Sequence, residues 1–481
     1  MAKFTVSAAI AAILSLAVPG WSACAAVPGD PVLGNVGPWG VVVHTHYHGD
    51  ALSREGVQWV RIGLGWKQIE QASKGTYNWA ETDRFVNYYD KMGFREMCII
   101  NAETINPLYV SDQANTETVI AAIASFAGEA AKRYRGKGIV WEIGNEPEVF
   151  PMGGYWNNPE TYTKLARACA KAIRAADPGG HVAACSVAWM DRSFITRCLD
   201  AGLLADGTID VVTYHGYHRA NLSPESGLAD DVQWLRTQVR DHAGAASVTV
   251  CDSERGYAIL PDGTPKPSDD WRNEVYTESE QAAYLSRHYL ESIHCLLPII
   301  VWYKDMNGEK EFSLWYSDEK GSRGLRPSGN VYRNLSHLLP GAPSGEVNAD
   351  YIVAVEGSDA GKAIVRTYMT PAASGKRKLV VAMWYPVEAF DGRILQERKR
   401  EANKIVETWR PTTAADVVSL KVRVRISGKK ISRIDGGLYD LLAPTTPSTL
   451  NAIPLTRAGK GALSEPLNIG PMPTVLVAEI E

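Results

Sequence analysis

Residues 139–148 read Ile139-Val-Trp-Glu-Ile-Gly-Asn-Glu-Pro-Glu148, a short apolar run that ends in polar side chains. The run from Ile139 to Gly144 favours a buried β-strand. Pro147 ends it, because a proline cannot donate to a central sheet ladder. Asn145 and Glu146 therefore stand just beyond the carboxyl end of the strand. In a parallel α/β fold this is the edge where catalytic groups gather.

Similar runs alternate with longer amphipathic stretches from residue 40 to about 340. The other strand candidates are Gly40–His46, Val57–Leu64, Arg95–Asn101, His181–Val187, Ile209–His215, Ser247–Ser253 and Pro298–Lys304. Helix candidates are Thr82–Met92, Glu117–Tyr134, Pro159–Ala176, Asp230–His242 and Ser279–Cys295, with a last helix ending at Leu335–Leu339. Eight such β-α units predict the α/β class and a closed (β/α)8 TIM barrel.

After residue 340 the pattern changes to short alternating strands separated by turns rich in Gly, Ser, Pro and Lys. The candidates are Tyr351–Glu356, Ala363–Tyr368, Lys378–Trp384, Val418–Ile426 and Thr474–Glu481, with no convincing helix among them. This pattern predicts a C-terminal antiparallel β-sandwich. We therefore divide the chain into a signal peptide at 1–26, a catalytic barrel at 27–340 and a sandwich domain at 341–481.

The first 26 residues have the pattern of a secretory signal peptide. Lys3 gives the positive start, Ala8 to Val18 the apolar run, and Ala23-Cys24-Ala25 the small-residue cleavage site. The run is too short to span a bilayer. We expect a secreted or periplasmic protein with no membrane span. A lipid anchor on Cys24 is the less favoured alternative, because Trp21 stands where that signal usually has a small aliphatic residue.

The composition is that of an ordinary globular protein, with 45% hydrophobic and 22% charged residues among 481. A formal net charge of −4 gives no basic stripe, so no nucleic-acid partner is expected. The 14 Trp and 21 Tyr outnumber the 8 Phe, and rings with a polar edge suit a carbohydrate groove. A carbohydrate is therefore the expected partner. The oligomeric state stays open, and the spacing of the cysteines after residue 26 assigns no disulfide.

A second glutamate ends the seventh strand, which reads Val248-Thr-Val-Cys-Asp-Ser-Glu254. Carboxylates from strands four and seven would face each other across the barrel mouth. Glycoside hydrolysis needs such a pair, one protonated and one ionised. A separation of about 5–5.5 Å gives a covalent intermediate and retention, whereas about 6.5–9.5 Å admits water and gives inversion. A single glutamate near a loop is usually a solvated charge, so the pairing is what favours catalysis.

With these residues the sequence resembles the clan A retaining glycoside hydrolases, and within them it is most similar to family 39. The resemblance runs from about residue 40 to 340, and families 5, 30 and 79 share the constellation. Its elements are Val60-Arg61, Trp66, Ile69-Glu70, Gly75-x-Tyr77-x-Trp79, Asp83, Gly93, Trp141 to Pro147, His215-Gly-Tyr217, Ser253-Glu254 and Trp302.

The resemblance implies catalytic roles for the two glutamates. Glu146 would be the general acid and base, and Glu254 the nucleophile. Asn145 would hydrogen-bond the sugar 2-hydroxyl, a contact that strengthens in the transition state. Arg61 would keep Glu254 ionised, because a nearby positive charge favours a carboxylate. No metal or organic cofactor is implied.

Tyr217 or His215 would donate to the nucleophile, with His215 preferred as a neutral ring that only orients its neighbours. Trp302 would form the apolar floor under the reacting sugar. Glu148 is interpreted as a loop charge, and the face that Glu142 occupies is left open. Further sugar contacts, each of which could equally be packing, are Trp39, His44, His46, Trp66, Asn101, Glu103, Trp156, Trp189 and Trp315.

A rival constellation ends strand one, where His44-Thr-His46-Tyr-His48 resembles the His-x-His of metal-dependent barrel hydrolases. Its further ligands would be His215 or His218 and Asp305. Strand five offers no histidine at Ser186 to Trp189, and strand four offers glutamate in place of a bridging lysine. We therefore prefer His44 and His46 as sugar contacts. A second rival, an inactive carbohydrate-binding barrel, is disfavoured because both acids are present.

Overall fold

A computed structural model describes most of the chain after residue 36. The described residues are 33, 37–44, 47–102, 105–112, 115–149, 157–217, 223–244, 246–259, 276–305, 310–318, 321–341, 351–371, 377–401, 404–428, 435–444, 451–452, 456–458 and 461–480. The predicted signal peptide lies outside them. Within this part of the chain, no helix has both the length and the apolar character needed to cross a membrane.

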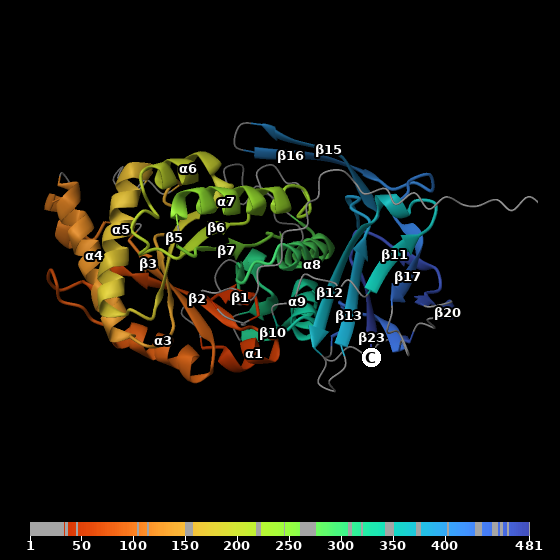
Figure 1. Ribbon diagram of the computed structural model, residues 1–481, viewed down its shortest axis with the longest axis horizontal. Coiled ribbons are helices and arrows are strands. Elements are labelled where there is room, and N and C mark those ends of the chain that lie inside the picture. The colour runs from red at the N-terminus through yellow and green to blue at the C-terminus, as the bar shows by residue number, and fades with distance from the viewer. Residues whose placement is uncertain are drawn as a thin grey trace, which may run out of the picture.

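Parallel strands close into an eight-stranded barrel in the order of the sequence (Figure 1). They are β1 (Trp39–Val42), β2 (Trp59–Gly65), β3 (Arg95–Asn101), β4 (Val140–Ile143), β5 (His181–Val187), β6 (Val211–His215), β7 (Thr249–Arg255) and β8 (Ile300–Trp302). Closure is made by β1, whose Gly40 pairs with Trp59 on one side and Val301 on the other. The predicted (β/α)8 barrel is confirmed.

Helices surround the barrel and return the chain to the start of each strand. They are α1 (Gly49–Arg54), α2 (Trp66–Ile69), α3 (Ala80–Lys91), α4 (Thr116–Arg133), α5 (Pro159–Ala176), α6 (Arg192–Asp200), α7 (Leu228–Ala243), α8 (Glu278–His294) and α9 (Pro327–Leu338). Capping side chains mark where two of these helices begin. Asn158 caps α5 by accepting from the Thr161 amide, with Pro159 at the first helical position. Thr277 and Glu280 form a capping box at α8.

Alternate residues of each barrel strand face two different layers. Val140, Cys251 and Val301 lie in the apolar cluster inside the barrel, whereas Trp141 and Trp302 pack in the cluster between sheet and helices. This is the period of two that an extended strand imposes. The described cysteines are buried and help to fill the core, namely Cys98, Cys169, Cys185, Cys198, Cys251 and Cys295.

The C-terminal region holds two antiparallel sheets packed face to face, as a β-sandwich requires. One contains β11 (Tyr351–Glu356), β17 (Leu420–Gly428), β20 (Thr456–Ala458), β21 (Gly461–Leu463) and, paired with β17, β22 (Leu467–Ile469). The other contains β12 (Ile364–Pro371), β13 (Arg377–Trp384), β23 (Thr474–Ile480), β18 (Asp435–Tyr439) and β19 (Asn451–Ala452). Val381 and Val424 meet in the core between them.

A third, three-stranded sheet was not predicted. It consists of β14 (Ala389–Phe390), β15 (Arg393–Glu401) and β16 (Lys404–Pro411). Figure 1 shows the β15–β16 hairpin extending from the sandwich toward the barrel side. Its sequence is mostly polar, so it carries no alternation of apolar residues to indicate a strand.

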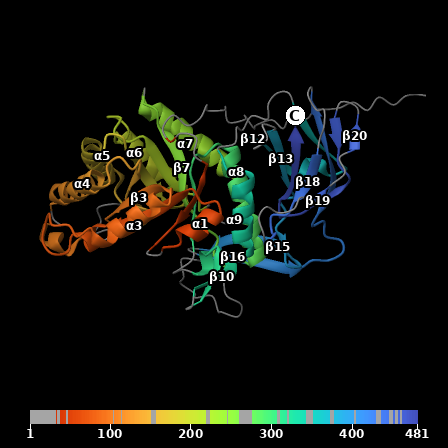
Figure 2. The ribbon, with the colours of Figure 1, turned by 90° about the horizontal axis from the view of Figure 1, so that it is seen from below.

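Helix α8 joins the barrel to the sandwich, and Figure 2 shows α8 and α9 between the two. Tyr368 of β12 donates its hydroxyl to the carbonyl of Leu290 at 2.8 Å. Arg287, fully buried on α8, bonds Glu388 just before β14 at 3.4 Å. The outer face of the second sheet shares the barrel's apolar cluster through Trp384. The two parts are therefore packed together and not linked by a loose tether.

Glu96 on β3 provides a test of the barrel's outer packing. It is 3% exposed, and burial, with a smaller effect of Asp90, raises its pKa to about 8. The folded-state pKa lies above the ordinary value of 4.5, so its contribution to stability is full below about pH 4.5 and is lost as the pH rises through 8. We expect Glu96→Gln to change the unfolding free energy little near pH 4 but to raise it by on the order of 2–4 kcal/mol at pH 8.

Urea unfolding at both pH values measures this difference. Glu81→Gln, which alters an exposed residue on α3, is the matched control and should give the same small effect at both. A Glu96→Gln variant no more stable than the wild type at pH 8 would contradict the assignment.

Candidate active site

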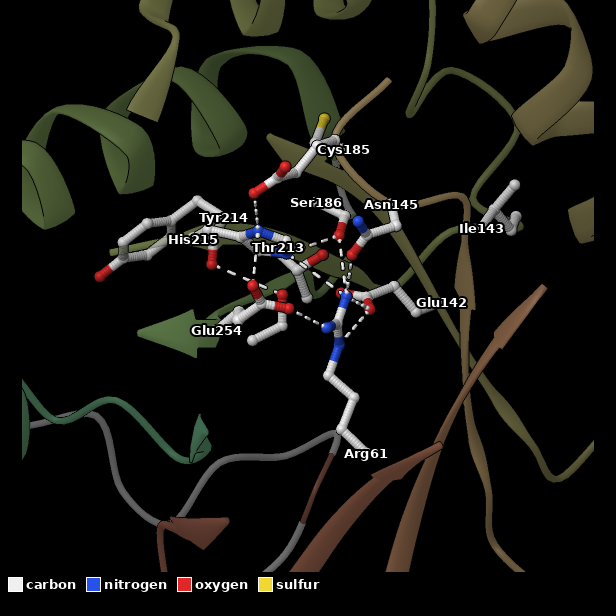
Figure 3. A network of polar contacts seen from close by, with 12 residues as sticks. Arg61, Glu142, Ile143, Asn145, Cys185, Ser186, Thr213, Tyr214, His215 and Glu254 are labelled. Carbon is white, nitrogen blue, oxygen red and sulfur yellow. Dashed lines mark hydrogen bonds and ion pairs between the residues drawn. The ribbon is translucent and has the colours of Figure 1, made fainter. Parts of the chain in front are cut away.

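Arg61 of β2 lies at the centre of a polar network at the carboxyl ends of the strands (Figure 3). Its side chain is 1% exposed. Nε donates to Glu142 at 2.7 Å, Nη1 to Glu254 at 2.5 Å, and Nη2 to Asn145 Oδ1 at 2.8 Å. The planar guanidinium presents donors in fixed directions, so it holds groups from β4 and β7 in one arrangement.

The two predicted catalytic glutamates come together. Glu146 follows β4 in a left-handed conformation, with φ of 46°, and its backbone N–H donates to the carbonyl of Ser186 at 2.9 Å. Glu254 lies near the end of β7. One carboxylate oxygen of each, and one ring nitrogen of His215, lie within 4.8 Å of one another. A left-handed glutamate costs on the order of 1–3 kcal/mol, and such residues cluster at functional sites.

His215, at the end of β6, bridges this pair. Its Nδ1 lies 2.7 Å from Glu146 Oε1 and 3.9 Å from Glu254, and its Nε2 lies 3.0 Å from Ser186 Oγ. Burial by itself lowers the pKa of His215, but Glu254 and Glu146 together outweigh burial and raise it. Of the two donors predicted for Glu254, Tyr217 and not His215 lies within hydrogen-bond distance. The raised pKa of His215 also differs from the neutral ring that we expected.

The neighbours of Glu254 oppose the effect of burial on its pKa. Burial raises the pKa of Glu254, and the charge of Glu146 adds to this. His215 and Arg61 lower that pKa, and so does the Tyr217 hydroxyl, which donates to Oε1 at 3.1 Å. The pKa remains raised overall. Loss of any of these donors would therefore make Glu254 harder to ionise.

Two predicted sugar contacts are packing residues. Trp302 is completely buried on the helix-facing side of β8 and donates to the carbonyl of Phe312 at 3.1 Å. The next residue, Tyr303, packs on the barrel interior, so the predicted floor is one residue out of register. Trp66 is also completely buried, and its indole N–H donates to Glu70. Neither tryptophan presents a ring to a ligand.

The other residues singled out in the sequence differ in their exposure. His44 is exposed, lies 3.2 Å from Lys304 Nζ, and meets the Tyr303 ring edge-on at 6.2 Å. Among the remaining tryptophans, Trp189 is 42% exposed, whereas Trp39 and Trp315 are buried and belong to the core. Asn101 ends β3 and is partly buried. Outside the described residues lie His46, Glu103, Trp156 and His218.

Three residues have roles that the sequence did not reveal. Ser186 stands within an apolar run, and only the fold brings its hydroxyl to His215. Glu142 lies completely buried beside Arg61, which settles the face left open by the sequence. Glu148 is not a solvated loop charge, because both of its carboxylate oxygens are buried and burial raises its pKa to about 8.

The metal alternative fits this geometry poorly. Among the described residues, the side chains close enough to share an ion are Glu146, His215 and Glu254. His44 and Asp305, which that alternative requires, are not in this group. The guanidinium of Arg61 already contacts Glu254 at 2.5 Å and would repel a second cation there.

Part of the chain matches a known family model. Residues 22–248 match the family model for cellulase, glycosyl hydrolase family 5. A comparison with curated proteins finds no match.

Solved structures share the fold at low identity. A family 39 glycoside hydrolase from Bacteroides cellulosilyticus WH2 aligns with a TM-score of 0.58 and 17% identity, over 91% of this chain and 80% of that one. A monomeric β-xylosidase from Caulobacter crescentus CB15 aligns with a TM-score of 0.55 and 14% identity, over 92% of this chain and 96% of that one. For the catalytic domain of a GH30 xylanase C from Talaromyces cellulolyticus the TM-score is 0.53 and the identity 14%, over 94% of this chain and 98% of that one.

The hydroxyl of Tyr217 tests the arrangement around Glu254. Tyr217→Phe removes a donor that lowers the pKa of Glu254, so the acidic limb of the kcat/KM profile should move to higher pH. Loss of one hydrogen bond to a charged group, worth about 1.5–3 kcal/mol, predicts a decrease in kcat/KM of roughly 10- to 100-fold. The pH profile on an aryl glycoside measures both effects.

Tyr214→Phe is the matched control, because the buried Tyr214 hydroxyl, on β6 three residues earlier, makes no hydrogen bond to a described residue. Equal effects of the two variants would show that Tyr217 acts only through packing.

Proposed function

We propose that this glycosidase cleaves O-glycosidic bonds by double displacement, with Glu146 as acid and base and Glu254 as nucleophile. The observation that carries the proposal is the proximity of the two carboxylates. One oxygen of Glu146 lies within 4.8 Å of one oxygen of Glu254. Retaining pairs stand about 5–5.5 Å apart, and a pair about 6.5–9.5 Å apart would be needed to seat an attacking water. The short separation favours retention.

In the first step Glu254 attacks the anomeric carbon while protonated Glu146 donates to the departing glycosidic oxygen. The C–O bond to the leaving group breaks, an ester bond to Glu254 forms, and the aglycone departs as an alcohol. Arg61 holds one oxygen of Glu254 and Tyr217 the other, so the carboxylate is aimed before the sugar arrives. Such fixed donors need no rearrangement during the reaction.

In the second step Glu146 accepts a proton from water, and the resulting nucleophile releases the sugar from Glu254. The ester of Glu254 carries no charge, so Glu146 no longer has an ionised neighbour and can act as the base. Asn145 turns its Oδ1 toward Arg61, which leaves the amide nitrogen to donate to the sugar 2-hydroxyl. That contact would strengthen as positive charge develops on the ring.

The proposed substrates are polysaccharides, oligosaccharides or glycoconjugates. Two of the structural neighbours are described as a β-xylosidase and a xylanase, so 4-nitrophenyl β-D-xyloside should lead a substrate panel that also contains the β-D-glucoside. Export through the predicted signal at residues 1–26 would place the enzyme among extracellular or periplasmic glycans. The preference for one sugar depends on the shape of the loops, and it is the first property to measure.

The catalytic assignment predicts different behaviour for the two glutamates. Glu254→Gln removes the nucleophile and should reduce kcat by about 10⁴-fold or more on every substrate. Glu146→Ala should reduce turnover of a glycoside with a poor leaving group by about 10²–10⁴-fold, but should retain activity on 2,4-dinitrophenyl glycosides. Added azide should rescue Glu146→Ala and yield the glycosyl azide. Near-normal turnover by Glu254→Gln would contradict the proposal.

The stereochemical course tests the double displacement directly. We expect ¹H NMR of the first minutes of hydrolysis to show the same anomer as the substrate, before mutarotation mixes the two. A 2-deoxy-2-fluoro glycoside with a good leaving group should add its sugar mass to a peptide that contains Glu254. Formation of the opposite anomer would rule out the covalent route.

A further inference from the structure

The leaving group must lie beside the acid that protonates it. On the proposed function, that acid is Glu146, so the aglycone sits where the β4 and β5 ends meet. Two strand ends adjoin Glu146. His215 at the end of β6 lies 2.7 Å from its carboxylate, and the carbonyl of Ser186 at the end of β5 accepts from its backbone N–H at 2.9 Å. An exposed side chain on the turn after Ser186 is therefore a candidate for the wall of the space that the aglycone enters.

That turn is the 3-10 element η2 (Ala188–Met190), and it projects one aromatic ring. Ala188 and Met190 are buried, whereas Trp189 is 42% exposed. Of the tryptophans named as sugar contacts and described in the structure, the others are buried. Trp189 and Met190 both have φ of 49°, a left-handed conformation that bulky residues rarely adopt. The exposed indole is thus held at the mouth by an unusual backbone.

The turn is also fixed to the loop that carries the acid. Glu148, two residues after Glu146, has both carboxylate oxygens buried. The hydrogen bond from the Glu146 N–H to the Ser186 carbonyl joins this loop to the segment that leads into η2. The turn that carries Trp189 and the loop that carries the acid are therefore held together.

We infer that Trp189 forms a leaving-group subsite that stacks on the sugar ring directly beyond the scissile bond. This makes the preferred substrates glycans with a second sugar, and not glycosides of small alcohols. The inference rests on the proposed function, because Glu146 defines which side is the leaving-group side. An indole face suits the apolar side of a pyranose ring.

The same subsite would serve a sugar acceptor. When the glycosyl ester on Glu254 meets a sugar hydroxyl in place of water, Glu146 removes the hydroxyl proton. The acceptor oxygen then bonds to the anomeric carbon, and the ester bond to Glu254 breaks. A ring stacked on Trp189 would be favoured over water in this step, so the wild-type enzyme should make longer glycans at high sugar concentration.

Trp189→Ala tests the subsite with two substrates of one sugar, the β-1,4 disaccharide and the β-glycosyl fluoride, using xylose or glucose as the substrate panel decides. The fluoride has a single-atom leaving group that cannot reach Trp189. We expect kcat/KM on the disaccharide to fall by about 10-fold, with less than about a 2-fold change on the fluoride. The ratio of transfer to hydrolysis should fall in parallel, and Trp189→Tyr should restore part of both.

Tyr316→Ala is the matched control. Tyr316 is an exposed aromatic, 37% accessible, on the hairpin of β9 (Trp315–Asp318) and β10 (Gly321–Leu325) beyond β8, and its hydroxyl donates to Glu278. Tyr316→Ala should change kcat/KM on the disaccharide and on the fluoride by the same factor. Equal losses on disaccharide and fluoride in Trp189→Ala, or no loss on either, would overturn the inference. An active Glu254→Gln would instead show that the proposed function has failed.

Discussion

The buried guanidinium of Arg61 is the interaction on which the rest of the site depends. A cation removed from water is stable only when carboxylates and hydrogen-bond acceptors surround it. Arg61 meets this need with Glu142, Glu254 and Asn145, which come from opposite sides of the barrel. The same contacts that compensate its burial also fix one carboxylate oxygen of Glu254 and the Asn145 amide. In the proposed mechanism these are the nucleophile and the group that binds the 2-hydroxyl, so one set of hydrogen bonds would serve both stability and catalysis.

The barrel makes this convergence possible because its eight strands end at one edge. Arg61 bonds both Glu142, inside the barrel, and Glu254, at the mouth. In the proposed mechanism Glu142 would be the permanent partner and Glu254 the partner that reacts. Esterification would remove the charge of Glu254, and Arg61 would still keep one carboxylate. His215 lies between the two proposed catalytic carboxylates, with Nδ1 2.7 Å from Glu146 and 3.9 Å from Glu254.

Much of the fold was predictable because its signals are local. The β5 and α5 boundaries at His181–Val187 and Pro159–Ala176 match the sequence prediction, since the strand is a continuous apolar run and the helix has a cap followed by proline. The two glutamates were found for the same reason, because both stand where an apolar strand gives way to polar residues. By contrast, the polar β15–β16 hairpin has no local signal and was missed.

The sequence by itself predicted the barrel, the sandwich and the pair of glutamates, and the resemblance to the clan A hydrolases placed Arg61 beside Glu254. The first three predictions came from hydrophobic period, strand ends and the order of the elements. Only the tertiary structure decided which ring faces a ligand, because a shift of one residue along a strand moves a side chain to the opposite layer. It placed Tyr303 and not Trp302 toward the barrel interior, buried Trp66, exposed Trp189, and set Ser186 against His215. Such contacts join residues from different strands, and their spacing is fixed when the barrel closes.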